Sequence, residues 1–270
     1  MLTSILAKNR SEDILSLPLE TPENGIIVAG IDGLGPVKAS IASSSFAGFD
    51  GSIPQAARRD VRNILIKFDL DPFRSVEDTR KLLYKFFLPK SYVTLVFTTD
   101  QGLNASITGM IESCDPVIFS KEPQMTVSII CFEPDFKGTN STRVQLVADG
   151  NYHDVEFNSE IETGFSTLIH ITEPMQELQF DVISPFGRRQ RLNYSGSHVA
   201  GDLLEISTKF GAKGAYLTRN SNTTSVLYGV TITSEYPVLY PGTNKIMMET
   251  FPNTTPFALE FEYRALYGGF

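Results

Sequence analysis

The chain has 270 residues, of which 41% are hydrophobic and 20% are charged, and its formal net charge is -8. This composition is typical of a globular protein with enough apolar residues for two cores of ordinary size, and it excludes a low-complexity chain. The acidic balance argues against tight binding to duplex nucleic acid, because contacts from lysine and arginine to phosphates supply most of that affinity.

The first 58 residues predict few regular elements. Residues 1–24 are polar and mixed, and they indicate an arm or a leading strand. A short strand is expected over 25–31, and Asp32-Gly33 and Gly35-Pro36 then signal turns. Residues 43–58 are small and glycine-rich without a period, and they predict a long loop. Loops of this length inside a compact domain are usually functional or become ordered on a partner.

The stretch from Arg59 to Phe136 holds the one convincing helix. The strand before it alternates, with Arg62, Ile64, Ile66 and Phe68 on the apolar side. Ser75 is a good N-cap for a helix over 76–87, and Pro72 and Pro89 bound that helix. We expect Leu82, Leu83 and Phe86 to be buried by its apolar face. Strands at 92–99 and 103–112 then form a hairpin.

Beyond residue 136 the sequence predicts only strands and turns. Residues 137–141 indicate a linker or a crossing strand, and Asp149-Gly150-Asn151 indicates a hairpin turn. Regular turn signals over the remaining residues are typical of a β-sandwich. The chain is therefore expected to be mainly β, with a first domain at 1–136 and a second at 137–270.

Residues that commonly carry chemistry are scarce. His153, His170 and His198 are scattered without metal-ligand spacing, so each is expected at the surface or in a core. The basic group Arg188, Arg189 and Arg191 is expected in a solvated turn. Cys131 lies in an apolar run and is expected to pack as a small hydrophobe, and a disulfide bond to Cys114 stays open. No signal peptide, membrane span, cofactor motif or catalytic constellation is apparent, and no enzyme activity is predicted.

Several motifs, in this order and spacing, resemble the distal tail proteins (Dit) of long-tailed siphophages. They are I-D-G-L-G-P-V-K-A at 31–39, D-G at 50–51, R-x-x-R-N-I-L-I at 59–66, V-E-D-T-R-K-L-L-Y-K-F-F at 76–87, I-E at 111–112, P-V-I-F-S at 116–120, V-S-I-I-C-F-E-P-D-F at 127–136, G-D-L-L-E-I-S-T at 201–208 and Y-P-G-T-N-K-I at 240–246. The resemblance implies an N-terminal split β-barrel with one α-helix and a C-terminal galectin-like β-sandwich. The sequence departs from some relatives because it has no room for a large insertion in the second domain, and it contains no tryptophan.

The resemblance also implies a function. The chain is expected to form a hexameric ring at the tip of a phage tail, to contact the tail tube protein and the tail-tip hub protein, and to let genomic DNA pass without binding it. It is then a virion component made in the cytoplasm of the bacterial host. The residues expected at the subunit interface are Asp32, Gly33, Leu34, Gly35, Pro36, Ser44, Phe46, Phe49, Asp50, Arg59, Arg62 and Arg80.

Two other classes of function stay open at this point. One is a carbohydrate-binding module for adhesion to the host, which glycan binding by the second domain would distinguish. The other is an enzyme, which requires a deep pocket with clustered, perturbed ionisable groups. For the ring itself, the acidic excess of residues 1–136, which hold 13 basic and 17 acidic side chains, predicts an acidic or neutral channel wall, with Arg80, Lys81 and Lys85 directed elsewhere. An even spread of acidic residues for solubility is the alternative.

Overall fold

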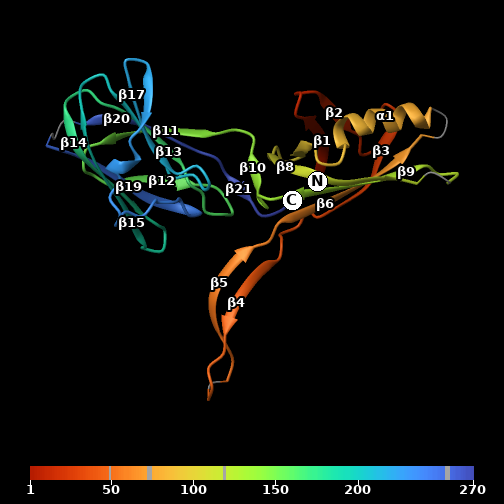
Figure 1. Ribbon diagram of the computed structural model, residues 1–270, viewed down its shortest axis with the longest axis horizontal. Coiled ribbons are helices and arrows are strands. Elements are labelled where there is room, and N and C mark those ends of the chain that lie inside the picture. The colour runs from red at the N-terminus through yellow and green to blue at the C-terminus, as the bar shows by residue number, and fades with distance from the viewer. Residues whose placement is uncertain (49, 72–74, 118–119, 253–255) are drawn as a thin grey trace. The chain divides into compact units, whose positions relative to one another are not determined.

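The computed structural model describes residues 1–48, 50–71, 75–117, 120–252 and 256–270. The described chain is mainly β, with one α-helix, and it divides into two compact units (Figure 1). The first unit contains Met1–Thr139 and Tyr267–Phe270, and the second contains Asn140–Leu266. The sequence predicted one division after residue 136 and did not indicate that the last four residues return to the first unit.

The first unit is built on one large antiparallel sheet in the order β2-β1-β7-β8-β9-β6-β3, with β10 and β21 off this path. The strand bounds are β1 (Leu2–Asn9), β2 (Ile14–Leu17), β3 (Ile26–Asp32), β6 (Arg62–Leu70), β7 (Tyr92–Thr99), β8 (Asn104–Pro116), β9 (Gln124–Cys131), β10 (Phe136–Gly138) and β21 (Leu266–Tyr267). The backbone N–H of Val28 in β3 donates to the carbonyl of Pro18, just after β2, at 2.8 Å. The two edges of the sheet therefore approach each other, as in a split barrel.

Helix α1 (Val76–Phe87) covers the apolar face of this sheet (Figure 1). The predicted cap is confirmed, because the Ser75 side chain accepts a hydrogen bond from the Asp78 backbone at 3.3 Å. Leu83, Phe86 and Phe87 are buried in the first core, whereas Leu82 is only partly buried. At 3.6 residues per turn, Leu82 lies about 90° from the centre of the face that the other three define. Leu82 still packs against the first core, but it is less buried than Leu83 and Phe86, the other two residues expected on the apolar face.

Other expectations for the first unit are confirmed or corrected by the strand pairing. Arg62, Ile64, Ile66 and Phe68 all lie on the buried side of β6, as the alternation predicted. The hairpin of β7 and β8 is confirmed. Of the two alternatives for residues 1–24, the strand is confirmed and the arm is not, because β1 pairs with both β2 and β7 inside the sheet.

The second unit is a sandwich of two antiparallel sheets. A six-stranded sheet has the order β11-β20-β13-β16-β17-β18, and a four-stranded sheet has the order β12-β19-β14-β15. Their bounds are β11 (Thr142–Ala148), β12 (His153–Phe157), β13 (Ser166–His170), β14 (Met175–Ile183), β15 (Arg189–His198), β16 (Leu203–Ser207), β17 (Gly214–Arg219), β18 (Asn222–Ser225), β19 (Gly242–Phe251) and β20 (Phe257–Tyr263), with a short 3-10 helix η1 (Leu227–Gly229). Side chains of both sheets share one core, in which the rings of Phe165 and Phe261 lie 4.2 Å apart.

The structure corrects the expectation for one turn and confirms the expectation that Cys131 packs in a core. The turn at Asp149-Gly150-Asn151 exists, but β11 pairs with β20 and β12 pairs with β19, so the turn connects the two sheets and closes no hairpin. Local turn signals do not reveal this, because strand partners in a sandwich are distant in sequence. Both cysteines are free thiols, and the Cys114 sulfur contacts the Met125 sulfur at 3.4 Å. The described helix is too short and too polar to cross a membrane.

Candidate subunit interface

A hairpin of strands β4 (Ala39–Ser44) and β5 (Ile53–Arg59) extends away from the large sheet (Figure 1). Among the described residues these strands pair only with each other. Ile41, Phe46 and Ile53 are 64%, 55% and 57% exposed. A lone two-stranded hairpin is only marginally stable in water, and its unpaired edges readily pair with another chain. The hairpin therefore has the properties of a segment that a partner covers.

This hairpin corrects the expectation of a long loop over 43–58. Strand pairing continues to Ser44 opposite Ile53, and Ser44 accepts a hydrogen bond from the side chain of Gln55 at 2.8 Å. The two strands are not recognisable from the sequence, because every side chain of β5 is exposed. With both faces exposed, nothing imposes the apolar and polar alternation from which strands are usually recognised. The paired residues Ala42 and Ala56 also have small side chains, which adds to the loop-like composition of this stretch.

The base of the hairpin is held at several points. The Asp60 backbone N–H donates to the Lys38 carbonyl at 2.9 Å, and Arg59 forms an ion pair with Asp135 at 2.7 Å. Gly33 has a φ of +89°, and a Cβ atom at this position would lie 2.0 Å from the Asn63 carbonyl oxygen. The turn before β4 therefore packs directly on the start of β6, where only glycine fits.

Arg62 connects the parts of this base, and it is only 1% exposed. Its guanidinium donates to four carbonyl oxygens: Pro134 at 2.6 Å, Gly33 at 2.6 Å, Gly35 at 2.7 Å and Gly268 at 2.6 Å. The guanidinium carbon also lies 4.4 Å from the centre of the Phe136 ring. Burial lowers the pKa of Arg62, but arginine is so basic that it stays charged, and the carbonyl dipoles compensate for the lost water.

The predicted interface residues fall into three groups in the structure. Those at the hairpin or its base are Asp32, Gly33, Leu34, Gly35, Pro36, Ser44, Phe46, Asp50 and Arg59. Arg62 belongs to the same base but is buried within the chain, and Arg80 lies apart on α1, where it donates to the Val117 carbonyl at 3.3 Å. Phe49 lies outside the described residues. All twelve assignments to an interface stay predictions.

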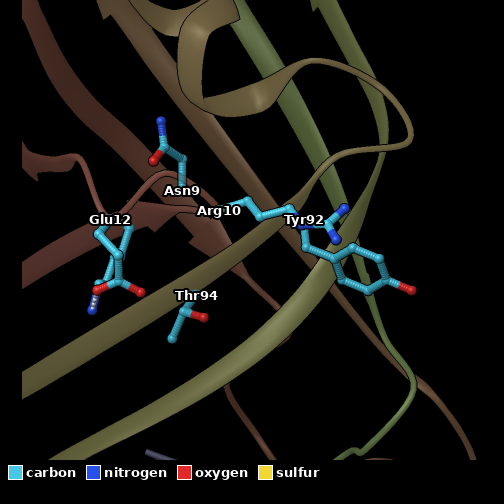
Figure 2. Close-up of a pocket in the computed structure, with 6 residues that line it drawn as sticks. Asn9, Arg10, Glu12, Tyr92 and Thr94 are labelled. Carbon is cyan, nitrogen blue, oxygen red and sulfur yellow. Dashed lines mark ion pairs between the residues drawn. The ribbon is translucent and has the colours of Figure 1, made fainter.

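Sequence reasoning missed a shallow hollow beside the turn between β1 and β2, with a volume of about 490 Å³ (Figure 2). It is lined by Lys8, Asn9, Arg10, Glu12, Tyr92 and Thr94. Lys8 and Glu12 form an ion pair, and Tyr92 is 45% exposed. A second hollow is also lined by Tyr92 and includes Phe132, which is 59% exposed. Open, shallow surfaces of this kind suit contact with a protein better than enclosure of a small ligand.

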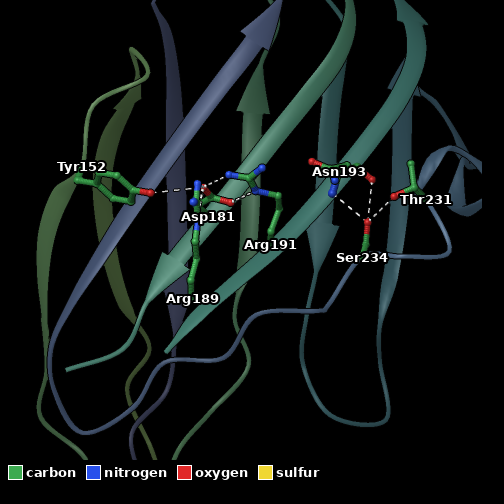
Figure 3. A network of polar contacts seen from close by, with 7 residues as sticks. All are labelled: Tyr152, Asp181, Arg189, Arg191, Asn193, Thr231 and Ser234. Atoms are coloured by element: carbon green, nitrogen blue, oxygen red, sulfur yellow. Dashed lines mark hydrogen bonds and ion pairs between the residues drawn. The ribbon is translucent and has the colours of Figure 1, made fainter. Parts of the chain in front are cut away.

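The second unit holds a polar network around Asp181, which is fully buried (Figure 3). Arg191 donates to its carboxylate at 2.7 Å, Arg189 donates at 3.0 Å, and the Tyr152 hydroxyl donates at 3.4 Å. Burial opposes ionisation of Asp181, but the hydrogen bonds from the arginines outweigh it and lower the pKa. Two of the three arginines expected in a solvated turn therefore bind a buried carboxylate. Both arginines reach Asp181 across the β14–β15 hairpin, in which Asp181 pairs with Arg191, so the strand register together with the burial of Asp181 reveals the contact.

A second buried group in this unit contains His198. The Tyr194 hydroxyl lies 2.9 Å from His198 Nε2, and Asp202 Oδ2 lies 3.7 Å from Nδ1. Arg219 donates to Asp202 at 2.7 Å, and this hydrogen bond is the largest of the contacts that together lower the pKa of Asp202 to about 2. Burial lowers the pKa of His198, which favours the neutral ring. The described residues contain no group of three or more side chains that could hold a metal ion.

The sequence matches no protein-family model and no curated protein sequence. The structure, however, is similar to the Dit protein of phage SPP1, which is described as a paradigm of the hub adsorption apparatus in phages that infect Gram-positive bacteria, with a TM-score of 0.69, 12% identity, and coverage of 97% of this chain and 99% of that one. A chain of the phage P2 baseplate in its activated conformation with Ca matches with a TM-score of 0.51 and 10% identity, over 98% of each chain. The whole chain therefore has the fold of these hub and baseplate proteins.

Proposed function

We propose that this chain is a distal tail protein, a structural subunit of a phage tail tip. Six copies form a ring that joins the tail tube protein to the tail-tip hub protein, and DNA passes through the ring during ejection. The observation that carries the proposal is the likeness of fold to the SPP1 Dit protein over 97% of the chain. The protein is then a virion component without enzymatic activity, and it is made in the host cytoplasm.

The exposed hairpin supports the assembly part of the proposal. In a ring with one kind of subunit, each copy uses two different surfaces, one for the copy before it and one for the copy after it. The β4–β5 hairpin can serve as one of these surfaces, because Ile41, Phe46 and Ile53 are apolar side chains that the described chain leaves exposed. We assign the hairpin to contact with the neighbouring copy.

The test measures the mass of the assembly by light scattering and its shape by electron microscopy, with and without the tail tube protein. The wild-type chain is expected as a six-membered ring in at least one of these conditions. A shortened hairpin, in which Asn-Gly replaces Ser43–Gln55 between the paired residues Ala42 and Ala56, should stay folded and stay out of rings. Phe210→Ser is the matched control, because Phe210 is 93% exposed but lies in the second unit. Rings built by the shortened chain refute the role of the hairpin, and failure of the wild type in both conditions refutes the ring.

A further inference from the structure

We infer that the segment Tyr267–Phe270 sets the position of the β4–β5 hairpin through the buried Arg62, so that the interface is presented only when this segment is seated. The inference rests on the proposed function, since it concerns the hairpin assigned to the neighbouring copy. It adds a positioning element that lies more than 200 positions away from the hairpin in sequence.

The segment is embedded in the first unit by contacts of three kinds. The Phe270 ring packs on Phe136 with ring centres 4.7 Å apart and on Phe97 with centres 5.4 Å apart. The Phe270 backbone N–H donates to the Leu34 carbonyl at 3.1 Å. The Gly268 carbonyl accepts from Arg62 at 2.6 Å. Phe270 is nevertheless 36% exposed, so the segment covers the surface of the core and does not lie at its centre.

These contacts converge on the turn that leads into β4. Residues 33–36 are held from one side by Arg62, which binds the carbonyls of Gly33 and Gly35. They are held from the other side by the segment, which binds the intervening carbonyl of Leu34. Three successive carbonyl positions of the turn are thus divided between a buried cation and the returning chain. Without the segment, the turn loses the hydrogen bond to the Leu34 carbonyl and keeps its hydrogen bonds to Arg62 and the packing of Gly33 on β6.

Arg62 couples the segment to the turn, because it binds carbonyl oxygens of both. Its guanidinium has donors committed to Gly268 as well as to the turn, and a buried cation that loses a partner is strongly destabilised. Loss of the segment exposes the cation on the Gly268 side to water, which competes for its remaining donors. Arg62 begins β6 three positions after β5 ends at Arg59, and it binds Gly35 four positions before β4 begins at Ala39, so the cation lies close in sequence to both strands of the hairpin.

Two glycines of this region offer a matched pair of substitutions. A Cβ atom at Gly269 would lie 2.9 Å from the Leu34 carbonyl oxygen and 3.0 Å from Pro36 Cδ, so Gly269→Ala pushes the segment off the turn. A Cβ atom at Gly35 would meet nothing within 4 Å. Gly35→Ala therefore changes the same residue type, in the turn that the segment contacts, without moving the segment. A third variant removes Tyr267–Phe270 altogether.

The experiment is hydrogen exchange of the unassembled chain, read at the Asp60 amide, which bonds to the Lys38 carbonyl, and across residues 33–44. We expect exchange there to rise by about tenfold or more in Gly269→Ala and in the shortened chain, with α1 unchanged and Gly35→Ala like the wild type. Wild-type exchange at the hairpin base in the shortened chain overturns the inference. Loss of protection throughout the first unit also overturns it, because the segment is then a general part of the core.

Ring formation supplies the second measurement. When mixed with wild-type protein, variants with a loosened hairpin base should be found in rings at less than about a tenth of the wild-type level. A mobile hairpin must first be ordered before it can bind the neighbouring copy, and this weakens binding. Normal assembly by a loosened variant overturns the coupling. If the wild type itself forms no ring, the proposed function fails, while the exchange result still decides whether the segment positions the hairpin.

Discussion

Replacement of Leu83 by alanine tests whether α1 is an integral part of the first core. The Leu83 side chain has no exposed surface and packs with Phe86 and Phe87. Leucine-to-alanine changes at such sites cost about 2–5 kcal/mol, through lost burial and the cavity that remains. For a unit of this size, roughly 3 °C of melting temperature is lost per kcal/mol, so we expect a decrease of roughly 6–15 °C.

The assay must separate the two units, because a signal from the whole chain mixes their transitions. Hydrogen exchange at increasing denaturant, read peptide by peptide, gives the stability of each unit. Leu82→Ala is the matched control: it removes the same atoms from a partly buried side chain, so its effect should be less than half as large. The second unit should not respond to either change. Equal losses in both variants, or an unchanged first unit in Leu83→Ala, refute the packing described for the helix.

Three further predictions concern charge and thiols. Because Arg219 lowers the pKa of Asp202 to about 2, this carboxylate stabilises the fold above the unfolded pKa of about 3.8, and the stability is lost as the pH falls from about 4 to 2. Arg219→Ala should remove most of this acid dependence in the second unit, and unfolding curves at pH 2–5 measure it. Burial raises the thiol pKa of Cys114 and of Cys131 to about 11, so at pH 7 Cys131 should react with a thiol reagent only after denaturation, and two free thiols should then be counted. The assembled ring should not bind duplex DNA at submicromolar affinity in physiological salt, and tight binding with a steep salt dependence would show a basic channel.

The structure adds one observation to the charge prediction. Lys81 lies within 3.5 Å of Glu77, and Lys85 forms an ion pair with Asp13 at 3.0 Å. These basic side chains of α1 are thus partly neutralised within the chain. Where they lie in an assembled ring stays a prediction, which the DNA-binding measurement and a structure of the ring will decide.

Sequence alone determined the features that depend on neighbouring residues. The buried side of β6 followed from alternation between Arg62 and Phe68, and the start of α1 followed from the Ser75 cap. Order and spacing of short motifs indicated the fold of the whole chain, which the likeness to the SPP1 Dit protein confirms. Such local signals are strong because one buried face or one satisfied backbone donor is enough to produce them.

Only the tertiary structure decided the features that depend on distant partners. The sequence placed Arg62 on the apolar side of a strand and among the expected interface residues, whereas its four carbonyl acceptors come from three separate parts of this chain. Asp181 meets Arg189 and Arg191 across one hairpin, but its complete burial and its contact with Tyr152 come from the packing of the sandwich. The β4–β5 hairpin resembled a loop because its side chains face solvent on both sides. A buried face along one strand or helix leaves a periodic pattern in the sequence. Contacts between residues that are distant in sequence, or with a second molecule, leave no such pattern.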